Sequence, residues 1–414
     1  MNLSHSKVNC IFTIRPAPYQ ELEDPRDTIL QSLLNPIGSP PLHGLVKKGH
    51  KVLVIADDLT RPTPQHLLIP PLLEELNNAG IPDRDIQILI ALGTHRRMTK
   101  AEIHGHFGRA VCRRVDVVNH EYDDPAFLET GGYTTNGTPI VVNRRVLESD
   151  IVLGVSSIAP HAQIGWGGGA KIVVPGVAGA DTVSRMHLLA ASQPDYPFVA
   201  GQVENPVRHL IEEVARKAGF TFIVNAIFNG QYALSRVVAG DPVTAHRSGV
   251  KIAEKIFIRP IPKLADVLIV DAHPADMDFW QGLKPATLAS LAVKPGGVII
   301  IKGSFPDGIS PVHDELDRFG TLNKNQIDSI VLEGAVSDGA SIGALYQHAA
   351  VRERATVLCV SDGISKAEAC RLGLRKAASL EEAIAAALQI KGSDAEIGII
   401  EEGGEVVPRL TRQL

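Results

Sequence analysis

KVLVIA, residues 51–56, is a short and almost wholly apolar run, and two acids, Asp57 and Asp58, follow it directly. A run of this length that ends at polar residues is typical of a strand buried on both faces of a parallel sheet. The pattern then predicts a helix from about Pro64 to Asn78, which Gly80 ends as a C-terminal stop signal. A strand, a polar loop and a helix in this order indicate an α/β fold.

The same alternation continues through the chain. Further buried strands are predicted over residues 86–92, 150–155, 221–225, 266–270, 297–301 and 355–360. Among the helices, one is predicted over residues 206–217, and a late one begins after Ser379, whose hydroxyl is suited to cap a helix N-terminus. We therefore expect doubly wound sheets with helices on both faces.

Two domains are expected, because 414 residues exceed what a single hydrophobic core usually organises. Residues 259–263 contain two prolines and little that a core would bury, so this stretch is the best candidate for a linker. We predict an N-terminal α/β domain over residues 1–262 and a C-terminal α/β domain over residues 263–414. The active site is expected in the cleft between them.

Composition excludes several classes of protein. Hydrophobic residues make up 44% and charged residues 21% of the chain, and the net charge is −5, so neither nucleic acid nor a membrane is an expected partner. No apolar run approaches the roughly 20 residues that span a bilayer, and residues 1–7 lack the pattern of a secretory signal. The four cysteines show no paired metal spacing, which fits a reducing compartment. We expect a cytoplasmic protein that binds a small molecule.

Three loops that follow predicted strands carry reactive groups, and ligands of open α/β sheets bind at such carboxyl ends. In the first loop, Asp58, Thr60 and Arg61 lie near two prolines. The planar guanidinium of Arg61 is suited to hold a carboxylate or a phosphate. The alternative is a plain helix N-terminus, in which Asp and Thr side chains cap the helix and Arg61 pairs with a neighbouring acid.

The second loop places His95 near Gly93, directly after the strand predicted over residues 86–92. Because the unperturbed pKa of histidine is roughly 6.5, a histidine at the carboxyl end of a strand is suited to acid–base chemistry. The alternative is a surface histidine in a turn that leads into a helix.

The third loop holds four glycines within residues 165–169, followed closely by Lys171. Glycines let backbone N–H groups approach a phosphate, but the P-loop pattern requires Gly-Lys-Ser/Thr. Here Ala170 precedes the lysine and Ile172 follows it, so the P-loop interpretation fails. A desolvated Lys171 above this glycine bed would lose its proton readily, which suits a nucleophile or an attachment point.

Two more segments add candidate ligands. Asp181 is expected to cap a helix that carries His187, whose neutral imidazole is suited to bind a metal, although a single helical histidine is more often ordinary packing. Gln281 and Lys284, beside Trp280, are suited to meet an anionic substrate from the opposite wall of the cleft. The structural alternative is a Trp280 that packs at the domain interface and a solvated Lys284.

Taken together, these segments resemble the nickel-pincer lactate racemase family. The resemblance rests on the order and spacing of five motifs between about residue 50 and about residue 290. They are Asp58-x-x-Arg61-Pro62, Gly93-Thr94-His95-Arg96, His161 followed ten residues later by Lys171, His187, and Gln281-x-x-Lys284. The set is specific, although no single motif is.

The resemblance implies a nickel-pincer nucleotide cofactor, the Ni(II) complex of pyridinium-3-thioamide-5-thiocarboxylic acid mononucleotide. Lys171 matches the lysine that carries it as a thioamide, and His187 matches the residue that completes the square plane of the metal. His95 and His161 match the acid–base pair. The positions that match cofactor contacts are Asp58, Thr60, Arg61, Gly168 and Gly169, and those that match substrate contacts are Arg61, Trp280, Gln281 and Lys284.

The activity that the resemblance implies is inversion of the α-carbon of a 2-hydroxy acid. One histidine takes the hydroxyl proton while hydride passes from the α-carbon to the cofactor. The resulting 2-oxo acid rotates, takes the hydride back on its other face and receives a proton from the second histidine. Two bases are needed because the enantiomers present their hydroxyls on different sides of one hydride acceptor. Enzymes that make the cofactor are the implied loading partners.

The chain departs from the family's pattern in three places. The glycine bed lacks an early serine, and Ala170 replaces a basic residue before the lysine, which concerns the nucleotide contacts. Trp280 stands where a lactate-specific enzyme is expected to carry tyrosine, so lactate, malate, phenyllactate and sugar acids are all candidate substrates. For a C-terminal aromatic wall, Tyr346 is the nearest candidate.

Two other functions stay open on the sequence. In the first, His95, His161 and His187 surround zinc or iron in a hydrolase or lyase, and Lys171 holds the substrate. In the second, the chain is a non-catalytic nucleotide-binding module that has kept the scaffold. A mass increment on Lys171, in protein produced together with the cofactor-making enzymes, distinguishes the racemase from the first alternative.

Overall fold

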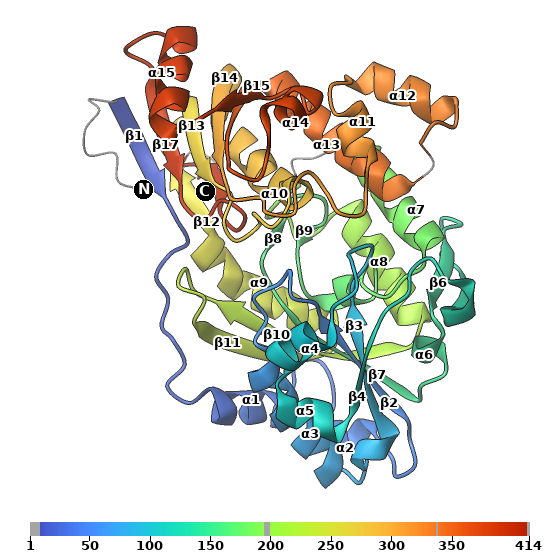
Figure 1. Cartoon of the computed structure of the whole chain (residues 1–414). Helices are drawn as coiled ribbons and strands as arrows, with labels where there is room; N and C mark the ends of the chain where they lie inside the picture. The colour runs from blue at the N-terminus through green and yellow to red at the C-terminus, as the bar shows by residue number, and fades with distance from the viewer. Residues whose placement is uncertain (1–8, 194–198, 337, 412–414) are drawn as a thin grey trace.

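Two six-stranded sheets, one in each of two lobes, form the framework of the chain (Figure 1). The computed structural model describes residues 9–193, 199–336 and 338–411. The sheet of the first lobe has the order β11-β10-β7-β2-β3-β4, and all neighbours are parallel except β10 and β11. Its strands are β2 (Val52–Asp57), β3 (Ile86–Ala91), β4 (Asp116–Asn119), β7 (Ile151–Ser157), β10 (Phe220–Phe228) and β11 (Leu234–Gly240).

Helices cover both faces of this sheet because successive strand residues point to opposite sides. Val54 and Ile88 belong to a buried cluster with side chains of α1, α3 and α4, whereas Leu53 and Leu89 pack with side chains of α7 and α8. The helices of the first lobe are α1 (Pro25–Leu34), α2 (Leu42–Leu45), α3 (Gln65–Asn78), α4 (Lys100–Phe107), α5 (Arg109–Arg114), α6 (Arg144–Leu147), α7 (Ala180–Ala191), α8 (Pro206–Lys217) and α9 (Thr244–Phe257).

The sheet of the second lobe has the order β1-β17-β13-β14-β15-β16 and is parallel throughout. Leu268 and Ile299 pack with α10 and α13 on one face, and Val267 and Val298 pack with α15 on the other. Its strands are β1 (Asn9–Ile14), β13 (Ala265–Asp271), β14 (Val293–Lys302), β15 (Ala355–Val360), β16 (Arg375–Ala377) and β17 (Glu396–Ile400). Its helices are α10 (Phe279–Ser290), α11 (Glu315–Phe319), α12 (Lys324–Leu332), α13 (Gly339–Arg354), α14 (Lys366–Arg371) and α15 (Leu380–Lys391).

Short elements join these layers. The two-stranded ladders pair β5 (Leu128–Tyr133) with β6 (Pro139–Asn143), β8 (Pro160–His161) with β9 (Gly165–Trp166), and β12 (Ile258–Ile261) with β18 (Val407–Leu410). The 3-10 helices are η1 (Asp83–Asp85), η2 (Pro125–Phe127) and η3 (Gly169–Ile172). Among these elements, β8, β9 and η3 hold the segment around Lys171.

The predicted α/β fold with doubly wound sheets is confirmed. The helix predicted over residues 206–217 is α8, and the late helix begins where it was expected, because the hydroxyl of Ser379 accepts the backbone N–H of Glu382. Gly80 follows α3 with a φ of 93°, the left-handed conformation that a helix-ending glycine adopts. In the described part of the chain, no helix has the length and apolar character of a membrane span.

The segment predicted as a linker, residues 259–263, is partly a strand. Ile258–Ile261 forms β12, which pairs in parallel with β18. A two-stranded ladder leaves one edge of each strand open, so it tolerates a proline such as Pro260, which has no N–H group to donate. Because of its prolines, this short strand was not predicted from the sequence.

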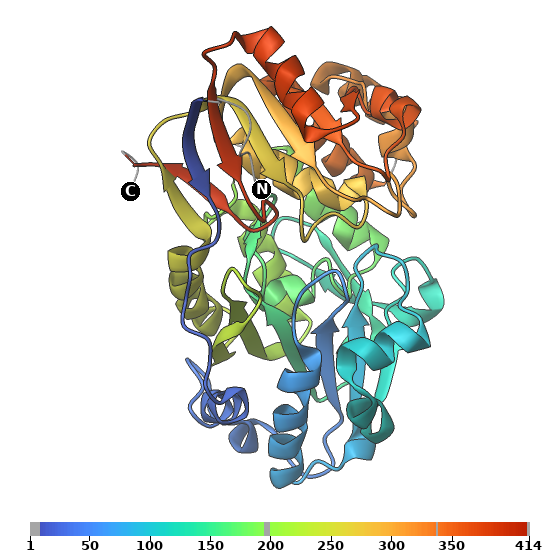
Figure 2. The same ribbon diagram turned by 60° about the vertical axis from the view of Figure 1, so that its left-hand side comes forward.

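The first described strand, β1, lies in the second lobe, where Asn9–Ile14 pairs with Glu396–Ile400 (Figure 2). The chain crosses from there to α1 in the first lobe and returns to the second lobe at β12 (Figure 2). The division into residues 1–262 and 263–414 stays a prediction, and β1 is a part of the first range that completes the second sheet. Residues 1–7, which are predicted to lack a secretory signal, lie outside the described residues.

Candidate active site

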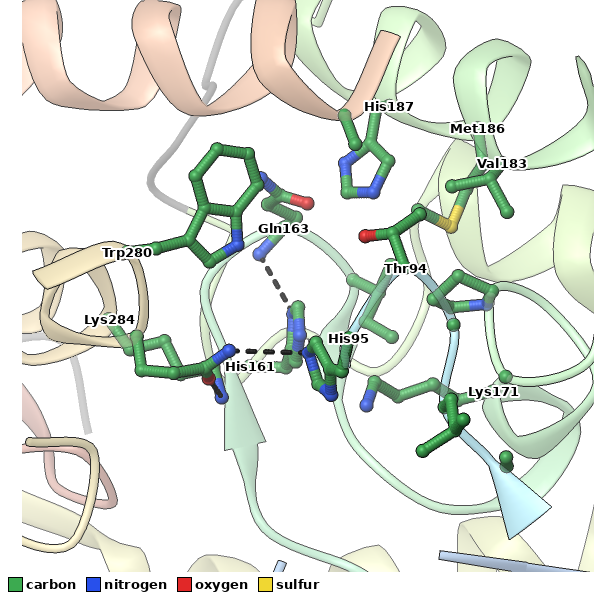
Figure 3. A pocket seen from close by; sticks show the side chains of 18 of the residues that line it. Thr94, His95, His161, Gln163, Lys171, Val183, Met186, His187, Trp280 and Lys284 are labelled. Carbon is green, nitrogen blue, oxygen red and sulfur yellow. Dashed lines mark hydrogen bonds between the residues drawn. The ribbon is translucent and has the colours of Figure 1, made fainter. Parts of the chain in front are cut away.

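A cavity lies where the loops after β2, β3 and β7 meet α10 and α13 of the second lobe (Figure 3). We call it the inner cavity; it holds about 960 Å³ of space, some of it open to solvent. Its polar lining residues include Asp58, Arg61, His95, His161, Lys171, His187, Trp280, Gln281 and Lys284. The two lobes thus bring most of the predicted site residues together.

A second cavity shares part of this lining. We call it the side cavity; Thr60, Ser157 and Gly168 line it from the first lobe, and Pro274 and Glu405 line it from the second. Arg61, His161, Lys171, Gln281 and Lys284 line both cavities. A ligand attached to Lys171 can therefore extend into either one.

The loop after β2 orients the histidine that follows β3. Nδ1 of His95 donates to Oδ2 of Asp58 at 2.8 Å, and the hydroxyl of Thr60 donates to Oδ1 of the same carboxylate at 2.6 Å. Burial acts to raise the pKa of Asp58, but its interactions with His95 and Arg61 and the hydrogen bond from Thr60 outweigh it and hold that pKa below its usual range. Asp58 is therefore an anion that fixes the ring of His95.

The alternative interpretation of this loop as a plain helix cap is wrong. The N-cap of α3 is Pro64, and no side chain caps that helix. The carboxylate of Asp58 serves His95 instead, and Asp57 accepts from the hydroxyl of Thr63 at 2.8 Å and from the backbone N–H of Ser157 at 3.1 Å. The two acids thus fasten the loop to the ends of neighbouring strands.

His161 lies at the end of β8, and Figure 3 shows it near His95 in the middle of the cavity. Its Nδ1 accepts the backbone N–H of Gln163 at 3.3 Å. Removal from bulk water, together with the positive charges of Lys171 and Lys284, holds the pKa of His161 well below its usual value. The imidazole is therefore neutral at neutral pH.

Lys171 belongs to η3 and follows the glycine bed, which we define as residues 167–169. Gly168 and Gly169 have φ values of 75° and 58°, and a Cβ on Gly168 would lie 2.8 Å from Ile158. Removal from bulk water and the charge of Arg61 lower the pKa of Lys171 to about 7, although the charges of Asp57 and Asp58 act to raise it. A large fraction of this amine is therefore unprotonated and nucleophilic near neutral pH.

Buried polar groups form hydrogen bonds to the backbone of the glycine bed, and they were not predicted from the sequence. Oδ1 of Asn225 accepts the N–H of Gly169 at 2.9 Å, and Arg208, which is fully buried, donates to the carbonyl of Gly168 at 3.2 Å. The ring of His246 donates to the carbonyl of Gly167 at 2.8 Å. Gly168 lines the side cavity, whereas Gly169 packs on His246 and lines neither of the two cavities.

His187 projects from α7 at the upper edge of the view in Figure 3. Its Nδ1 is buried and has no hydrogen-bond partner among the described residues. Removal from bulk water lowers the pKa of His187 to about 4, although Asp338 acts in the opposite direction. A neutral imidazole with an unused nitrogen is the form that binds a metal. The prediction that Asp181 caps this helix is wrong, because the N-cap of α7 is Gly179 and Asp181 lies in the first turn.

The second lobe contributes the first turns of α10. Asp278 caps this helix by accepting the N–H of Gln281 at 2.7 Å. Lys284 donates to Oε1 of Gln281 at 2.8 Å, and Nε2 of Gln281 donates to Nε2 of His95 at 3.2 Å. Removal from bulk water and the charges of Arg61 and Lys171 hold the pKa of Lys284 well below its usual value. The alternative of a solvated Lys284 is therefore wrong.

Trp280 supplies the aromatic wall of the inner cavity. Its indole stacks on the ring of His313, with centroids 4.1 Å apart and planes 14° from parallel. Nε2 of His313 in turn lies 3.0 Å from the hydroxyl of Thr94, the residue before His95. Tyr346, the candidate for a C-terminal aromatic wall, lines neither cavity, and its hydroxyl donates to Asp328.

An amide pair closes another part of the inner cavity and was also missed. Nε2 of Gln163 donates to Oε1 of Gln347 at 3.0 Å, and Nε2 of Gln347 donates to the hydroxyl of Thr287 at 2.7 Å. Both glutamines are buried and line the cavity. No local sequence pattern marks such a pair, because the contact joins positions far apart in the chain.

The donor geometry does not fit a metal held by all three predicted histidines. In the part of the chain that the structure describes, the group of metal-type ligand atoms within 4.8 Å of one another belongs to His313, Glu315 and Asp338. Hydrogen bonds to Ser341 and Thr94 already join that group. His95, His161 and His187 form no such cluster, so a zinc or iron site built from these three is not supported.

Comparisons with family models and with known proteins agree on one family. Residues 1–196 match the lactate racemase N-terminal domain, and residues 262–407 match the lactate racemase C-terminal domain. The lactate racemase of Thermoanaerobacterium thermosaccharolyticum is 26% identical over 415 residues, covering 99% of this chain and 96% of the relative. The lactate racemase of Lactiplantibacillus plantarum is 27% identical over 405 residues, covering 94% and 92%.

Solved structures agree with these similarities. The lactate racemase apoprotein from Thermoanaerobacterium thermosaccharolyticum superimposes with a TM-score of 0.86 at 25% identity, covering 99% of this chain and 97% of the other. A protein from Thermotoga maritima superimposes with a TM-score of 0.72 at 22% identity, covering 95% and 100%, and this second likeness concerns the fold alone.

Proposed function

The chain belongs to the lactate racemase family and is an isomerase of the racemase type, and we propose that it inverts the α-carbon of a 2-hydroxy acid with a nickel-pincer nucleotide attached to Lys171. One observation carries the proposal. Two histidines, an amine of lowered pKa and an imidazole with an unpartnered nitrogen line a single cavity.

The residues present fit the proposed cofactor. His187 lines the inner cavity, and its pKa of about 4 leaves the imidazole neutral, as a metal ligand requires. Lys171 lies at the junction of the two cavities, so a group joined to it reaches His187 on one side and Arg61 and Gly168 on the other. When bound, the cofactor would supply a hydride acceptor beside the substrate. The enzymes that make the cofactor are the expected loading partners.

The charges of the two cavities favour anionic ligands. Arg61, Lys171 and Lys284 line both cavities, and their mutual repulsion contributes to the lowered pKa values of the two lysines. An anion among them would relieve that repulsion. We assign the substrate carboxylate to Lys284 and Arg61, which would hold the reacting carbon in place.

Hydrogen bonds set the two catalytic histidines in complementary states. His95 donates from Nδ1 to Asp58 and accepts at Nε2 from Gln281, so Nε2 carries the lone pair of a base. His161 accepts at Nδ1 from the backbone N–H of Gln163, so the single proton of its neutral ring is on Nε2. We propose that one ring removes the hydroxyl proton of the substrate while the other returns a proton, and that the roles exchange for the opposite enantiomer.

The inner cavity favours a substrate larger than lactate. Beyond the histidines it is lined by the indole of Trp280 and by the paired amides of Gln163 and Gln347. Ala340 and Ala344 of α13 add small side chains to the same lining and leave room beside His187. We therefore assign the substrate to 2-hydroxy acids whose side chain is aromatic or polar.

Two measurements test the proposal. Protein produced together with the cofactor-making enzymes should show, by intact-mass measurement, an increment on Lys171, and a proteolytic peptide should locate it. Single enantiomers of lactate, malate, phenyllactate and a sugar acid, incubated with the loaded protein, should yield the opposite enantiomer or epimer in chiral chromatography. An unmodified Lys171 under these conditions would count against the cofactor, and no inversion of any 2-hydroxy acid would count against the reaction.

A further inference from the structure

The side cavity has a wall that the proposed chemistry does not use. On the first-lobe side it is lined by Thr60, Ser157 and Gly168, and by the guanidinium of Arg61. On the second-lobe side the lining comes from the segment after β13 and from the loop between β17 and β18. Glu405, in that second loop, contributes a carboxyl group to this wall.

Glu405 is held firmly, and one of its carboxyl oxygens has no hydrogen-bond partner in the described part of the chain. It is 5% exposed, and its Oε2 is enclosed with no hydrogen-bond partner among the described residues. The loop is fastened by its backbone, because the N–H of Gly403 donates to the carbonyl of Asp271 at 2.8 Å and the N–H of Glu405 donates to that of Glu402 at 3.1 Å. The loop therefore holds the carboxyl at the wall of the side cavity.

A buried carboxyl without hydrogen bonds is unfavourable for the protein alone. Burial and the neighbouring Glu402 raise the pKa of Glu405 to about 7, although the charges of Lys284 and Arg61 act against the rise. A ligand that donates hydrogen bonds to this carboxyl would remove the unfavourable term. Buried groups of this kind in a cavity wall are typical of binding sites.

The chemistry of the two walls selects the part of a ligand that each one binds. A phosphate would be repelled by Glu405 and attracted by Arg61, so it belongs on the first-lobe side. A carboxylate accepts from hydroxyl groups, and an acidic side chain that binds ribose hydroxyls is common in nucleotide sites. A metal ion is a poorer fit, because no cluster of three metal-type ligand atoms in the described chain includes Glu405.

We propose that Glu405 binds the ribose hydroxyls of the nucleotide, on the second-lobe wall of the side cavity. This inference rests on the proposed function, since the nucleotide is that of the proposed cofactor. It assigns a nucleotide contact to a part of the chain in which the sequence motifs predicted none. It also gives the nucleotide a direction, with its ribose toward the loop between β17 and β18 and its phosphate toward Thr60, Ser157 and Gly168 on the first-lobe side.

Binding of two probes to the purified apoprotein tests the proposal without any turnover. The probes are nicotinic acid mononucleotide and its 2′,3′-dideoxy analogue, titrated by isothermal calorimetry. Hydrogen bonds to a charged acceptor predict that the wild type binds the dideoxy analogue about ten-fold or more weakly. In Glu405→Leu, which cannot accept a hydrogen bond, the two probes should bind with similar affinity.

Two further variants make the result specific. Glu402→Gln alters a carboxyl of the same loop that does not line the side cavity, so it should keep the full difference between the probes. Glu405→Gln retains one acceptor oxygen and should give a smaller difference than the wild type, and it replaces the leucine variant if thermal melting shows that variant to be unfolded.

The outcomes separate the inference from the function on which it rests. Equal affinity of the wild type for both probes, or a difference that persists in Glu405→Leu, would overturn the role of Glu405 and leave the racemase intact. Failure of the wild type to bind nicotinic acid mononucleotide at all would overturn the inference and also count against a nucleotide cofactor.

Discussion

The two walls of the inner cavity differ in how they present their functional groups. The first lobe supplies His95, His161 and Lys171 from loops and short elements that follow strands, each fixed by buried polar contacts. The second lobe supplies Trp280 and Lys284 from the first turns of one helix. Under the proposed function, the reacting groups all belong to the first lobe, whereas the second lobe supplies the aromatic wall and one of the two cations that hold the substrate. Substitutions in the two walls should therefore have separable effects.

The largest effect is expected at Lys171. Lys171→Ala removes the proposed attachment point, so racemisation of any accepted substrate should fall to the uncatalysed rate, and the mass increment should disappear. Chiral chromatography and intact-mass measurement on co-produced protein check both outcomes. Lys48→Ala, at an exposed lysine of the first lobe, should keep the increment and the activity.

Substitution of either catalytic histidine should come next. His95→Ala and His161→Ala should each lower kcat by about 10²- to 10⁴-fold in both directions, because each inversion uses one ring to take a proton and the other to return one. Initial rates from each pure enantiomer give the measurement. His104→Ala, at an exposed histidine of α4, serves as the control. Unchanged rates in both histidine variants would point to a non-catalytic module.

The lowered pKa of Lys171 predicts an unusual pH profile. Because its pKa is about 7 instead of 10.5, the neutral amine should become dominant as the pH rises through 7 and stay constant above about 8. Acetylation of the apoprotein, followed by peptide mass spectrometry, should therefore label Lys171 with a midpoint near pH 7. Arg61→Ala removes a repelling charge and should move that midpoint upward. A wild-type midpoint near 10 would contradict the desolvated amine.

Changes in the second wall should alter substrate choice more than chemistry. Trp280→Ala removes the aromatic wall and should raise KM for an aromatic or polar 2-hydroxy acid by about ten-fold, with kcat changed much less. Trp280→Tyr keeps an aromatic ring and should therefore change the preference less than Trp280→Ala. Competition between lactate and phenyllactate measures the shift. An equal fall of kcat with both substrates would place Trp280 in the chemistry instead.

The smallest effect is expected at the contact between the walls. Thr94→Val removes the hydrogen bond to His313 from the first lobe, so the folded state should lose about 1 kcal/mol. Thermal melting should show a decrease in Tm of about 2 °C, with activity within a few-fold of the wild type. His313→Phe keeps an aromatic ring beneath Trp280 but removes that bond together with the contacts to Ser341 and Asp338, so its loss should be larger, and Thr94→Val should not add to it in the double variant.

Local pattern was sufficient for most of the framework. The continuous apolar runs of strands such as β2 and the hydroxyl cap of Ser379 are encoded over a few neighbouring positions. The rule that ligands collect after the carboxyl ends of parallel strands placed His95 and Lys171 at one site. These parts of the prediction required only the nearest residues and the fold class.

The parts of the fold and of the site that were not predicted depend on contacts between distant segments. Arg208 and Asn225 support the glycine bed from α8 and β10, and no pattern in either segment marks them. Pro260 suggested a linker, but the pairing of β12 with a strand near the C-terminus decided its structure. Glu405 follows two glycines after β17, and that pair, at the carboxyl end of a strand, was the signal that the sequence offered for it.

The position of β1 has a consequence for synthesis on the ribosome. Among the described strands, β1 is made first, and its neighbour β17 is made long after it. At about 5–20 residues per second, β1 waits on the order of 20 to 80 seconds for its partner. The first lobe can assemble during that interval, whereas the second sheet, and with it Glu405 beyond β17, is completed last. A truncated nascent chain therefore carries the reactive lysine and histidines of the first lobe before the loop that lines the side cavity exists.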